Sequence, residues 1–360
     1  MMANAQPIKQ FAPPRRILII KLRHHGDMLL TTPVISTLKQ HYPQAEIDML
    51  VYLETRDMLA SEPDLTHLFT IDRTWKKQGT FAHLGHESRL IKQLTARKYD
   101  LVVNLADQWR SALVTKLTGA PVRLGFDLPK RKGKLWQFCH THLVDVSGHN
   151  QLHTVEQNLS ILAPLNLPSV DTSVTMSYAP EDRARVEQIL DEKRVTGDFV
   201  VIQPTSRWFF KCWTDEKMAE TITALHGAGK TVVLTSGPAE NELKMIDRIL
   251  ALSPQDGVVS LAGQLSLRQL AALIDKASLF IGVDSVPMHM AAALQTPLVA
   301  LFGPSKRVFW SPWQANGEVI WAGDFCELPD PDDIDTHTSE RYLDAIPAQT
   351  VIDAARKRLP

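Results

Sequence analysis

The feature that most constrains the fold of this chain is a regular alternation of short, β-rich apolar runs with amphipathic segments. The alternation begins at residues 16–22 (RILIIKL) and begins again at residues 199–203 (FVVIQ). It is typical of α/β domains that are built on a parallel sheet. A chain of 360 residues has the length of two such domains. We therefore predict an α/β fold of two Rossmann-like lobes with a cleft between them.

The same pattern predicts the individual elements. In the first lobe we expect strands at residues 16–22, 46–52, 68–71 and 100–105. We expect one helix that follows the first strand and ends near residue 40, and further helices at residues 87–97, 108–117 and 154–165. In the second lobe we expect helices at residues 214–226, 239–252, 267–276 and 288–294, and strands at residues 199–203, 230–235, 258–261, 279–283 and 298–302. We assign residues 1–170 to the first lobe and 171–346 to the second. Residues 347–360 are expected to form an amphipathic helix that packs back on the first lobe.

Composition excludes several classes of protein. Hydrophobic residues make up 44% and charged residues 22%, which are ordinary values for a soluble globular chain. No apolar run approaches the roughly 20 residues that span a bilayer, and the first residues lack the apolar segment of a signal peptide. The chain has three cysteines, Cys139, Cys212 and Cys326, which are far apart and form no C-x-x-C pair. We expect a cytoplasmic protein with reduced thiols and no zinc site.

Charge is unevenly distributed along the chain. Residues 1–175 contain 21 Lys/Arg and 15 Asp/Glu, whereas the remaining residues contain 18 and 25. The first lobe is therefore basic and the second acidic. This favours a different partner for each lobe, although two domains can also differ in charge by chance.

The first candidate site follows the first strand. In open parallel sheets, ligands bind beyond the carboxyl ends of the strands, at the N-termini of helices. Gly26 and Asp27 lie at this position. A carboxylate there can take a proton from a substrate hydroxyl, or it can simply cap the following helix. No G-x-G-x-x-G and no P-loop pattern is present, so neither NAD nor P-loop nucleotide binding is supported.

The second candidate site follows the strand at residues 199–203. Thr205, Ser206, Arg207 and Lys211 combine hydroxyl donors with cations, which is the chemistry that a diphosphate needs. The alternative is an ordinary solvated loop.

The third candidate site is a helix N-terminus that follows the strand at residues 279–283. Asp284 and Ser285 precede a helix rich in small residues, and the N–H groups of a helix N-terminus bind anions. His289 lies one turn into this helix, where it faces either the anion or the core.

Taken together and in this order, these motifs resemble the ADP-heptose lipopolysaccharide heptosyltransferases. The matching segments are HHGD, PTSRWFFKCW, SGPAENE, GVDSVPMHMAAA and LFGPS, and the resemblance extends from Arg15 to about Trp313. It implies a GT-B fold with an acceptor-binding first lobe and a donor-binding second lobe. HHGD and GVDSVPMHMAAA are most similar to the subgroup that adds a branch heptose to heptose II of the inner core.

The resemblance also implies roles for individual residues. Asp27 and Lys211 match the catalytic residues, the first as a base and the second as the cation that stabilises the departing ADP. Glu240 matches the acid that holds the ribose hydroxyls, with Glu242 as an alternative. The residues that match donor contacts are Thr205, Ser206, Arg207, Lys211, Glu240, Asp284, Ser285, Val286 and His289.

The chain departs from the family pattern at two places. It has His24-His25 where a small hydroxyl residue commonly precedes Gly-Asp, and Val286 where glycine is common. We assign His25 to acceptor binding. The basic loop PKRKGK provides further acceptor-binding candidates, which are Lys130, Arg131, Lys132 and Lys134. We expect this loop to meet lipid A or core phosphates at the cytoplasmic face of the inner membrane, unless it is only a solvated turn.

The implied reaction is an inverting transfer of L-glycero-D-manno-heptose from ADP-heptose to the lipopolysaccharide inner core. We expect no required cofactor or metal and no nucleic-acid partner, and we interpret the acidic tract at residues 324–335 as a solvated loop. The alternatives are transfer to another core heptose, another sugar-nucleotide transferase of the same fold, an NAD-dependent enzyme, and a sugar-binding protein without chemistry. The last of these would normally carry a signal peptide.

Overall fold

The structure is a computed structural model of the chain, and it describes residues 8, 12–131 and 133–359. The chain divides into two compact units, Met1–Thr175 and Met176–Pro360. The division lies in residues 166–179, a segment in which no residue belongs to a helix or strand. The boundary that we placed at 170/171 falls in the same segment.

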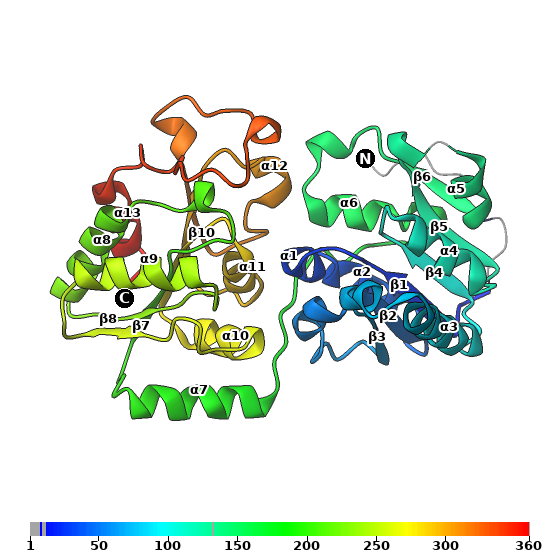
Figure 1. Cartoon of the computed structure of the whole chain (residues 1–360), viewed down its shortest axis with the longest axis horizontal. Helices are drawn as coiled ribbons and strands as arrows, with labels where there is room; N and C mark the ends of the chain where they lie inside the picture. Colours follow the sequence, from blue (N-terminus) through cyan, green and yellow to red (C-terminus); the bar gives the residue numbers. More distant parts are fainter. Residues whose placement is uncertain (1–7, 9–11, 132, 360) are drawn as a thin grey trace. The chain divides into compact units, whose positions relative to one another are not determined.

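The described part of the first unit contains a six-stranded sheet in the order β3-β2-β1-β4-β5-β6 (Figure 1). Each pair of neighbouring strands is parallel. The strands are β1 (Arg16–Ile20), β2 (Glu46–Tyr52), β3 (His67–Ile71), β4 (Leu101–Asn104), β5 (Val122–Asp127) and β6 (His142–Asp145). The order reverses between β1 and β4, which is the position where ligands bind in doubly wound sheets.

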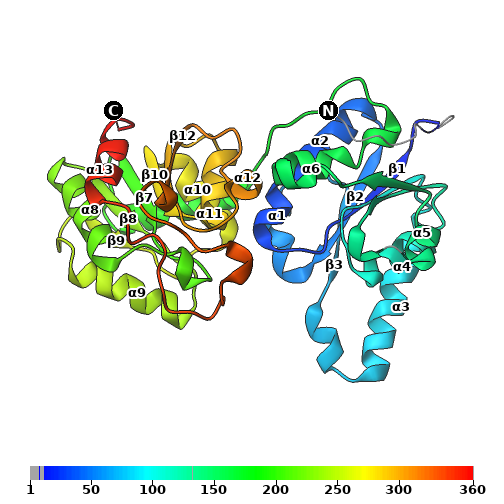
Figure 2. The same cartoon turned by 90° about the horizontal axis from the view of Figure 1, so that it is seen from above.

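Helices cover both faces of this sheet, so that Ile17 to Ile20 of the central strand β1 have no exposed area. Figure 2 shows that α3 and the preceding η2 project away from the sheet. The α-helices are α1 (His25–Leu29), α2 (Thr32–His41), α3 (Thr80–Ala96), α4 (Trp109–Leu117), α5 (Lys134–Cys139) and α6 (Thr154–Ser160). The 3-10 helices are η1 (Leu53–Met58), η2 (Arg73–Lys77), η3 (Pro129–Arg131), η4 (His149–Gln151) and η5 (Ala163–Leu165).

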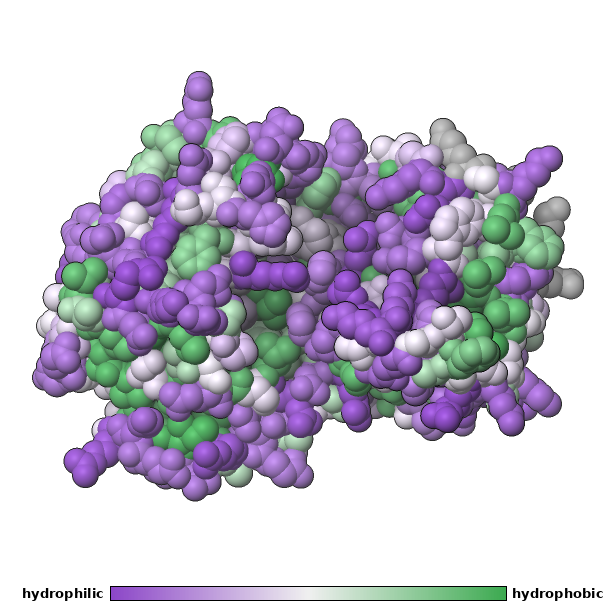
Figure 3. All heavy atoms as spheres, viewed as in Figure 1, coloured by the Kyte–Doolittle hydropathy of each residue, from purple (hydrophilic) through white to green (hydrophobic). Residues whose placement is uncertain are grey.

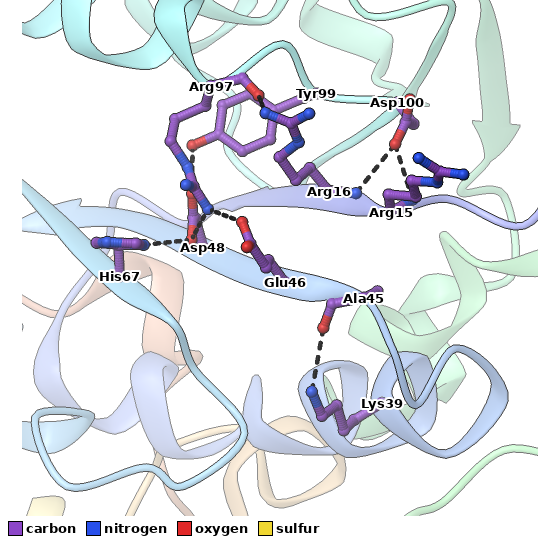
Figure 4. Close-up of polar contacts among 10 residues, drawn as sticks. All are labelled: Arg15, Arg16, Lys39, Ala45, Glu46, Asp48, His67, Arg97, Tyr99 and Asp100. Carbon is purple, nitrogen blue, oxygen red and sulfur yellow. Dashed lines mark hydrogen bonds and ion pairs between the residues drawn. The ribbon is translucent and has the colours of Figure 1, made fainter.

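The amino ends of the first sheet are held together by a buried carboxylate (Figure 4). Asp48 of β2 has no exposed area, and its Oδ2 accepts hydrogen bonds from Arg97 Nε and Tyr99 OH, both at 2.7 Å. Burial, together with the hydrogen bond to this carboxylate, raises the pKa of Tyr99. His67 Nδ1 lies 3.2 Å from Asp48 Oδ1. This cluster is at the edge opposite to the candidate site, and we interpret it as structural.

The described part of the second unit repeats the architecture, with a six-stranded sheet in the order β12-β11-β10-β7-β8-β9. All neighbouring pairs are parallel. The strands are β7 (Phe199–Gln203), β8 (Thr231–Leu234), β9 (Val258–Ser260), β10 (Leu279–Val283), β11 (Leu298–Phe302) and β12 (Gly317–Trp321). The order reverses between β7 and β10, so the residues that follow these two strands are brought together.

The helices of the second unit follow the same plan. The α-helices are α7 (Pro180–Glu192), α8 (Asp215–Gly227), α9 (Glu240–Ala251), α10 (Leu267–Lys276), α11 (Val286–Ala293), α12 (Arg307–Trp310) and α13 (Ala348–Arg356), and the 3-10 helices are η6 (Phe209–Lys211), η7 (Ala322–Asp324) and η8 (Pro331–Asp333).

The last helix, α13, differs from our expectation that it packs back on the first lobe. It lies against α8 and β11 of the second unit. Val351 and Ala355 are fully buried in the core of that unit. The apolar face of the helix is therefore already covered by its own unit.

The sequence did not predict the strands β5, β6 and β12, the helices α5 and α7, or the first half of α3. The strands β6 and β12 lie at sheet edges and are partly exposed, so they lack the continuous apolar runs of the central strands. In α3 the first buried residue is Leu90, so the preceding turns carry no apolar period that could have predicted a helix.

Candidate functional site

The candidate site of the first unit begins at the turn between β1 and α1. Asp27 is the third residue of α1. Its Oδ2 accepts a hydrogen bond from the backbone N–H of His24 at 3.3 Å, and its carbonyl oxygen accepts one from Thr31 Oγ1 at 2.7 Å. The side chain therefore makes the capping contact that we considered as an alternative to a catalytic role. A single bond of 3.3 Å to one oxygen still leaves most of the acceptor capacity of the carboxylate for a substrate.

A buried lysine that was not predicted from the sequence lies beside this turn. Lys21 directly follows β1, its residue is 6% exposed, and its Nζ donates to Asn158 Oδ1 at 2.9 Å. Burial lowers the pKa of Lys21, while the charge of Asp27 acts in the opposite direction. The signal in the sequence was a lysine inside the apolar run RILIIKL, because lysine is almost never buried without a partner.

A second carboxylate at the same edge contacts cations from two loops, those that follow β1 and β5. Asp107, which follows β4, lies 3.2 Å from Arg23 and 3.8 Å from Lys130 through its Oδ2. Arg131 Nε donates to the carbonyl oxygen of Asp107 at 2.7 Å. The structure thus places two of the four predicted cations of the PKRKGK loop at the carboxyl edge of the sheet. Neither Asp107 nor Arg23 was predicted.

The other predicted residues of the first unit are placed differently. Lys134 is exposed at the start of α5, and Lys132 lies outside the described residues. His25 Nε2 is 2.8 Å from the carbonyl oxygen of Glu54, and burial lowers the pKa of the imidazole. His25 is therefore directed toward η1.

The central contact of the second unit is an ion pair that joins the loops after β7 and β10. Lys211 Nζ lies 2.6 Å from Asp284 Oδ2, with the two side chains 13% and 6% exposed. The ammonium also lies 5.0 Å from the ring centre of Trp208. An ammonium has three donors, so this pair fixes Lys211 without using all of them.

Thr205 forms the second part of this site. Its residue is 1% exposed, and its hydroxyl accepts from Gln203 Nε2 at 3.0 Å and donates to Glu242 Oε2 at 2.6 Å. Glu242 Oε2 also accepts from the backbone N–H of Gly237 at 3.0 Å. These contacts hold the N-terminal end of α9 next to the loop that follows β7.

Glu240, in contrast, points into solvent. Its side chain is 82% exposed and pairs with Lys244 on the same helix at 2.6 Å. Of the two glutamates that the sequence left open, the geometry therefore favours Glu242 as the one that faces the other predicted residues.

The remaining donor candidates surround the same edge of the second sheet. Ser285 is the N-cap of α11 and Val286 its first residue. Ser206 and His289 are buried, whereas Arg207 is exposed. The structure therefore brings hydroxyl groups, one held cation and a helix N-terminus to one edge, which is an arrangement able to bind an anion such as a diphosphate.

The acidic tract at residues 324–335 contains η7 and η8. Asp332 pairs with Lys306 at 2.5 Å. The described residues contain no cluster of three or more His, Cys, Asp or Glu side chains that could hold a metal ion. In the same described part of the chain, no helix combines the length and the apolar character needed to cross a bilayer.

Comparison with known proteins gives concordant matches. A family model for glycosyltransferase family 9 (heptosyltransferase) matches residues 88–337. The chain is 45% identical over 339 residues to lipopolysaccharide heptosyltransferase 3 of Escherichia coli, with 94% of this chain and 98% of that protein covered.

Solved structures show the same fold. The glycosyl transferase family 9 from Veillonella parvula has a TM-score of 0.80 at 21% identity, with 95% of this chain and 96% of that chain covered. The E. coli ADP-heptose lps heptosyltransferase II has a TM-score of 0.75 at 23% identity, with 95% and 98% covered. The expected α/β fold of GT-B class with two Rossmann-like lobes is confirmed.

Proposed function

The chain belongs to glycosyltransferase family 9, the heptosyltransferases, and from this we propose that it moves L-glycero-D-manno-heptose from ADP-heptose onto heptose II of the lipopolysaccharide inner core. That it is a glycosyltransferase follows from the family. The choice of heptose II is carried by one observation, the similarity along nearly the whole chain to lipopolysaccharide heptosyltransferase 3.

The second unit is proposed to bind the donor. In this proposal Lys211, held by Asp284 at 2.6 Å, stabilises the diphosphate as it departs. The hydroxyl of Ser206 and the N-terminus of α11 donate to phosphate oxygens. The single O–H donor of Thr205 goes to Glu242, so Thr205 positions that carboxylate at the donor site. Glu242 takes the ribose-binding role that the resemblance gave to Glu240, because it is directed toward Thr205.

The first unit is proposed to bind the acceptor and to supply the base. The acceptor hydroxyl oxygen forms the new bond to the anomeric carbon, the bond between that carbon and the diphosphate oxygen breaks, and ADP leaves with the bonding electrons. Asp27 accepts the hydroxyl proton. Attack from the face opposite to the leaving group inverts the anomeric configuration.

Lys130 and Arg131 support a role of this unit in holding an anionic acceptor, because both lie against Asp107 at the same edge as Asp27. Since the acceptor is anchored in a lipid, we also propose that the protein works as a peripheral protein on the cytoplasmic face of the inner membrane. We propose no metal and no other cofactor for the reaction.

The proposal is tested by incubating the purified full chain with ADP-heptose and lipid-free core oligosaccharides that end at Kdo, heptose I or heptose II. We expect ADP release and the gain of one heptose only with the acceptor that contains heptose II, and the same rate in the presence of a chelator. Transfer to the acceptor that ends at heptose I would refute the assignment of heptose II. Turnover only with a different nucleotide sugar would refute the donor.

A further inference from the structure

We propose that the outer face of helices α4 and α5 docks the protein on an anionic lipid bilayer. We call this surface the α4–α5 face and define it by the exposed side chains of Trp109, Leu113, Leu117, Leu135 and Phe138. The inference rests on the proposed function in one respect, which is that an enzyme acting on a lipid-anchored saccharide has to work at a membrane surface.

The apolar residues of this face are arranged as a stripe. Trp109, Leu113 and Leu117 are four residues apart on α4 and therefore lie on one side of the helix. Leu135 and Phe138 are three residues apart on α5, which packs beside α4. The five residues are between 39% and 63% exposed. Figure 3 shows apolar surface gathered over this part of the first unit.

The exposed stripe is not needed to attach the two helices to the unit, because their other sides do so. Ala112 of α4 and Trp136 and Cys139 of α5 are fully buried and form a small core cluster. Trp136 Nε1 donates to the carbonyl oxygen of Phe126 at 3.0 Å, which fixes α5 on β5. Large apolar side chains that are left in water on the opposite sides favour an interaction with another apolar phase.

The charge around the stripe indicates what kind of partner it fits. Residues 108–141 contain seven Lys/Arg and one acidic residue. Two of these cations lie directly on the aromatic residues of the face: Lys116 Nζ is 4.0 Å from the ring centre of Phe138, and the guanidinium of Arg131 is 5.3 Å from that of Trp109. Apolar side chains surrounded by cations, with a tryptophan among them, are typical of helices that lie in the interface of an anionic membrane.

The position of the stripe also fits a membrane-bound acceptor. Trp109 begins α4 two residues after Asp107, and Arg131 contacts both residues. The α4–α5 face is therefore continuous with the edge that carries Lys130 and Asp27. A protein partner would bury the same leucines without a need for one sign of charge, so the excess of cations favours lipid.

The experiment measures binding of the full chain to vesicles by co-sedimentation. Vesicles of phosphatidylglycerol and phosphatidylethanolamine are compared with vesicles of phosphatidylcholine alone. The test variant is Leu113→Ser/Leu117→Ser/Phe138→Ser, and its control is Leu252→Ser, since Leu252 of the second unit is 54% exposed, like Leu117. A charge variant, Lys116→Glu, is paired with Lys193→Glu, which changes an exposed lysine of the second unit.

We expect the wild type to prefer the anionic vesicles, the triple variant to bind them at least ten-fold more weakly, and Lys116→Glu to bind about ten-fold more weakly. Both controls should bind as the wild type does. All variants should keep the wild-type rate with a lipid-free acceptor, because the changed side chains are exposed, or half-buried in the case of Lys116, and lie outside the proposed catalytic machinery.

Wild-type binding by the triple variant would overturn the inference, as would equal binding of the wild type to both kinds of vesicle. So would a wild-type dimer, seen by sedimentation velocity, that the triple variant loses while it keeps its affinity for vesicles. The vesicle measurement needs no turnover, so a protein that binds vesicles through this face but transfers no heptose would refute the proposed function and leave the docking surface standing.

Discussion

Breaking the ion pair between Lys211 and Asp284 is expected to lower both the stability of the second unit and its affinity for the donor. In Lys211→Met the buried carboxylate of Asp284 loses an ammonium that lies 2.6 Å away. An uncompensated buried charge costs about 3–5 kcal/mol. Because the Lys211 side chain is still 13% exposed, water partly solvates the remaining charge, and we expect a loss near the lower limit, about 3 kcal/mol.

The double variant Lys211→Met/Asp284→Asn separates the two effects. It removes the unpaired charge while it keeps the shape of the site, so most of the free energy of unfolding should return. Affinity for ADP should not return with it, because the contact between the ammonium and phosphate is worth about 1.5–3 kcal/mol, or roughly 10–150-fold. The relevant comparison is with Asp284→Asn alone, in which Lys211 is still present.

Urea unfolding and calorimetric titration with ADP on the wild type, both single variants and the double variant provide the complete cycle. Recovery of ADP affinity together with stability would show that Lys211 only neutralises Asp284, and the proposed role in stabilising the diphosphate would be wrong. Unchanged stability of Lys211→Met would refute the reasoning from burial.

Three further predictions concern single residues. Asp27→Asn should fold normally, since asparagine caps a helix about as well as aspartate, but its kcat should fall by about 10²–10⁴-fold; wild-type ADP release by the folded variant would rule out the general base. Glu242→Gln should weaken ADP-heptose binding by about 1.5–3 kcal/mol, whereas the matched change Glu240→Gln should leave the Kd within about two-fold, as expected for a solvated side chain; the opposite order would reassign the ribose contact. Burial lowers the pKa of His140 from its ordinary value of 6.5, so the folded protein holds this imidazole neutral while the unfolded chain protonates it, and stability that is complete above pH 6.5 should decrease as the pH falls below it. Replacing His140 by Gln should flatten the dependence of Tm on pH in this range; an unchanged slope would show that other groups carry it.

The sequence by itself determined the architecture and the position of the main functional turns. Central strands such as β1 and β10 are buried on both faces, so each needs a continuous apolar run that is visible without the structure. The residues that follow such a run lie at the carboxyl edge of a parallel sheet, which is why Asp27, Thr205 and Asp284 could be selected as candidates. The outer strands β6 and β12 are only partly buried and were missed, whereas β3 and β9, which also lie at sheet edges, still carry apolar runs that predicted them.

The tertiary structure alone decided which of these residues meet. Lys21 contacts Asn158, and Lys211 contacts Asp284, across long stretches of chain. These contacts depend on the order of the strands, which local apolar periodicity does not encode. The choice of Glu242 over Glu240 depends in turn on the rotation of α9, since two residues of separation on a helix turn side chains in nearly opposite directions. Local patterns specify which segments are buried, whereas the pairing of polar side chains is set only when the packed sheet brings the ends of distant strands together.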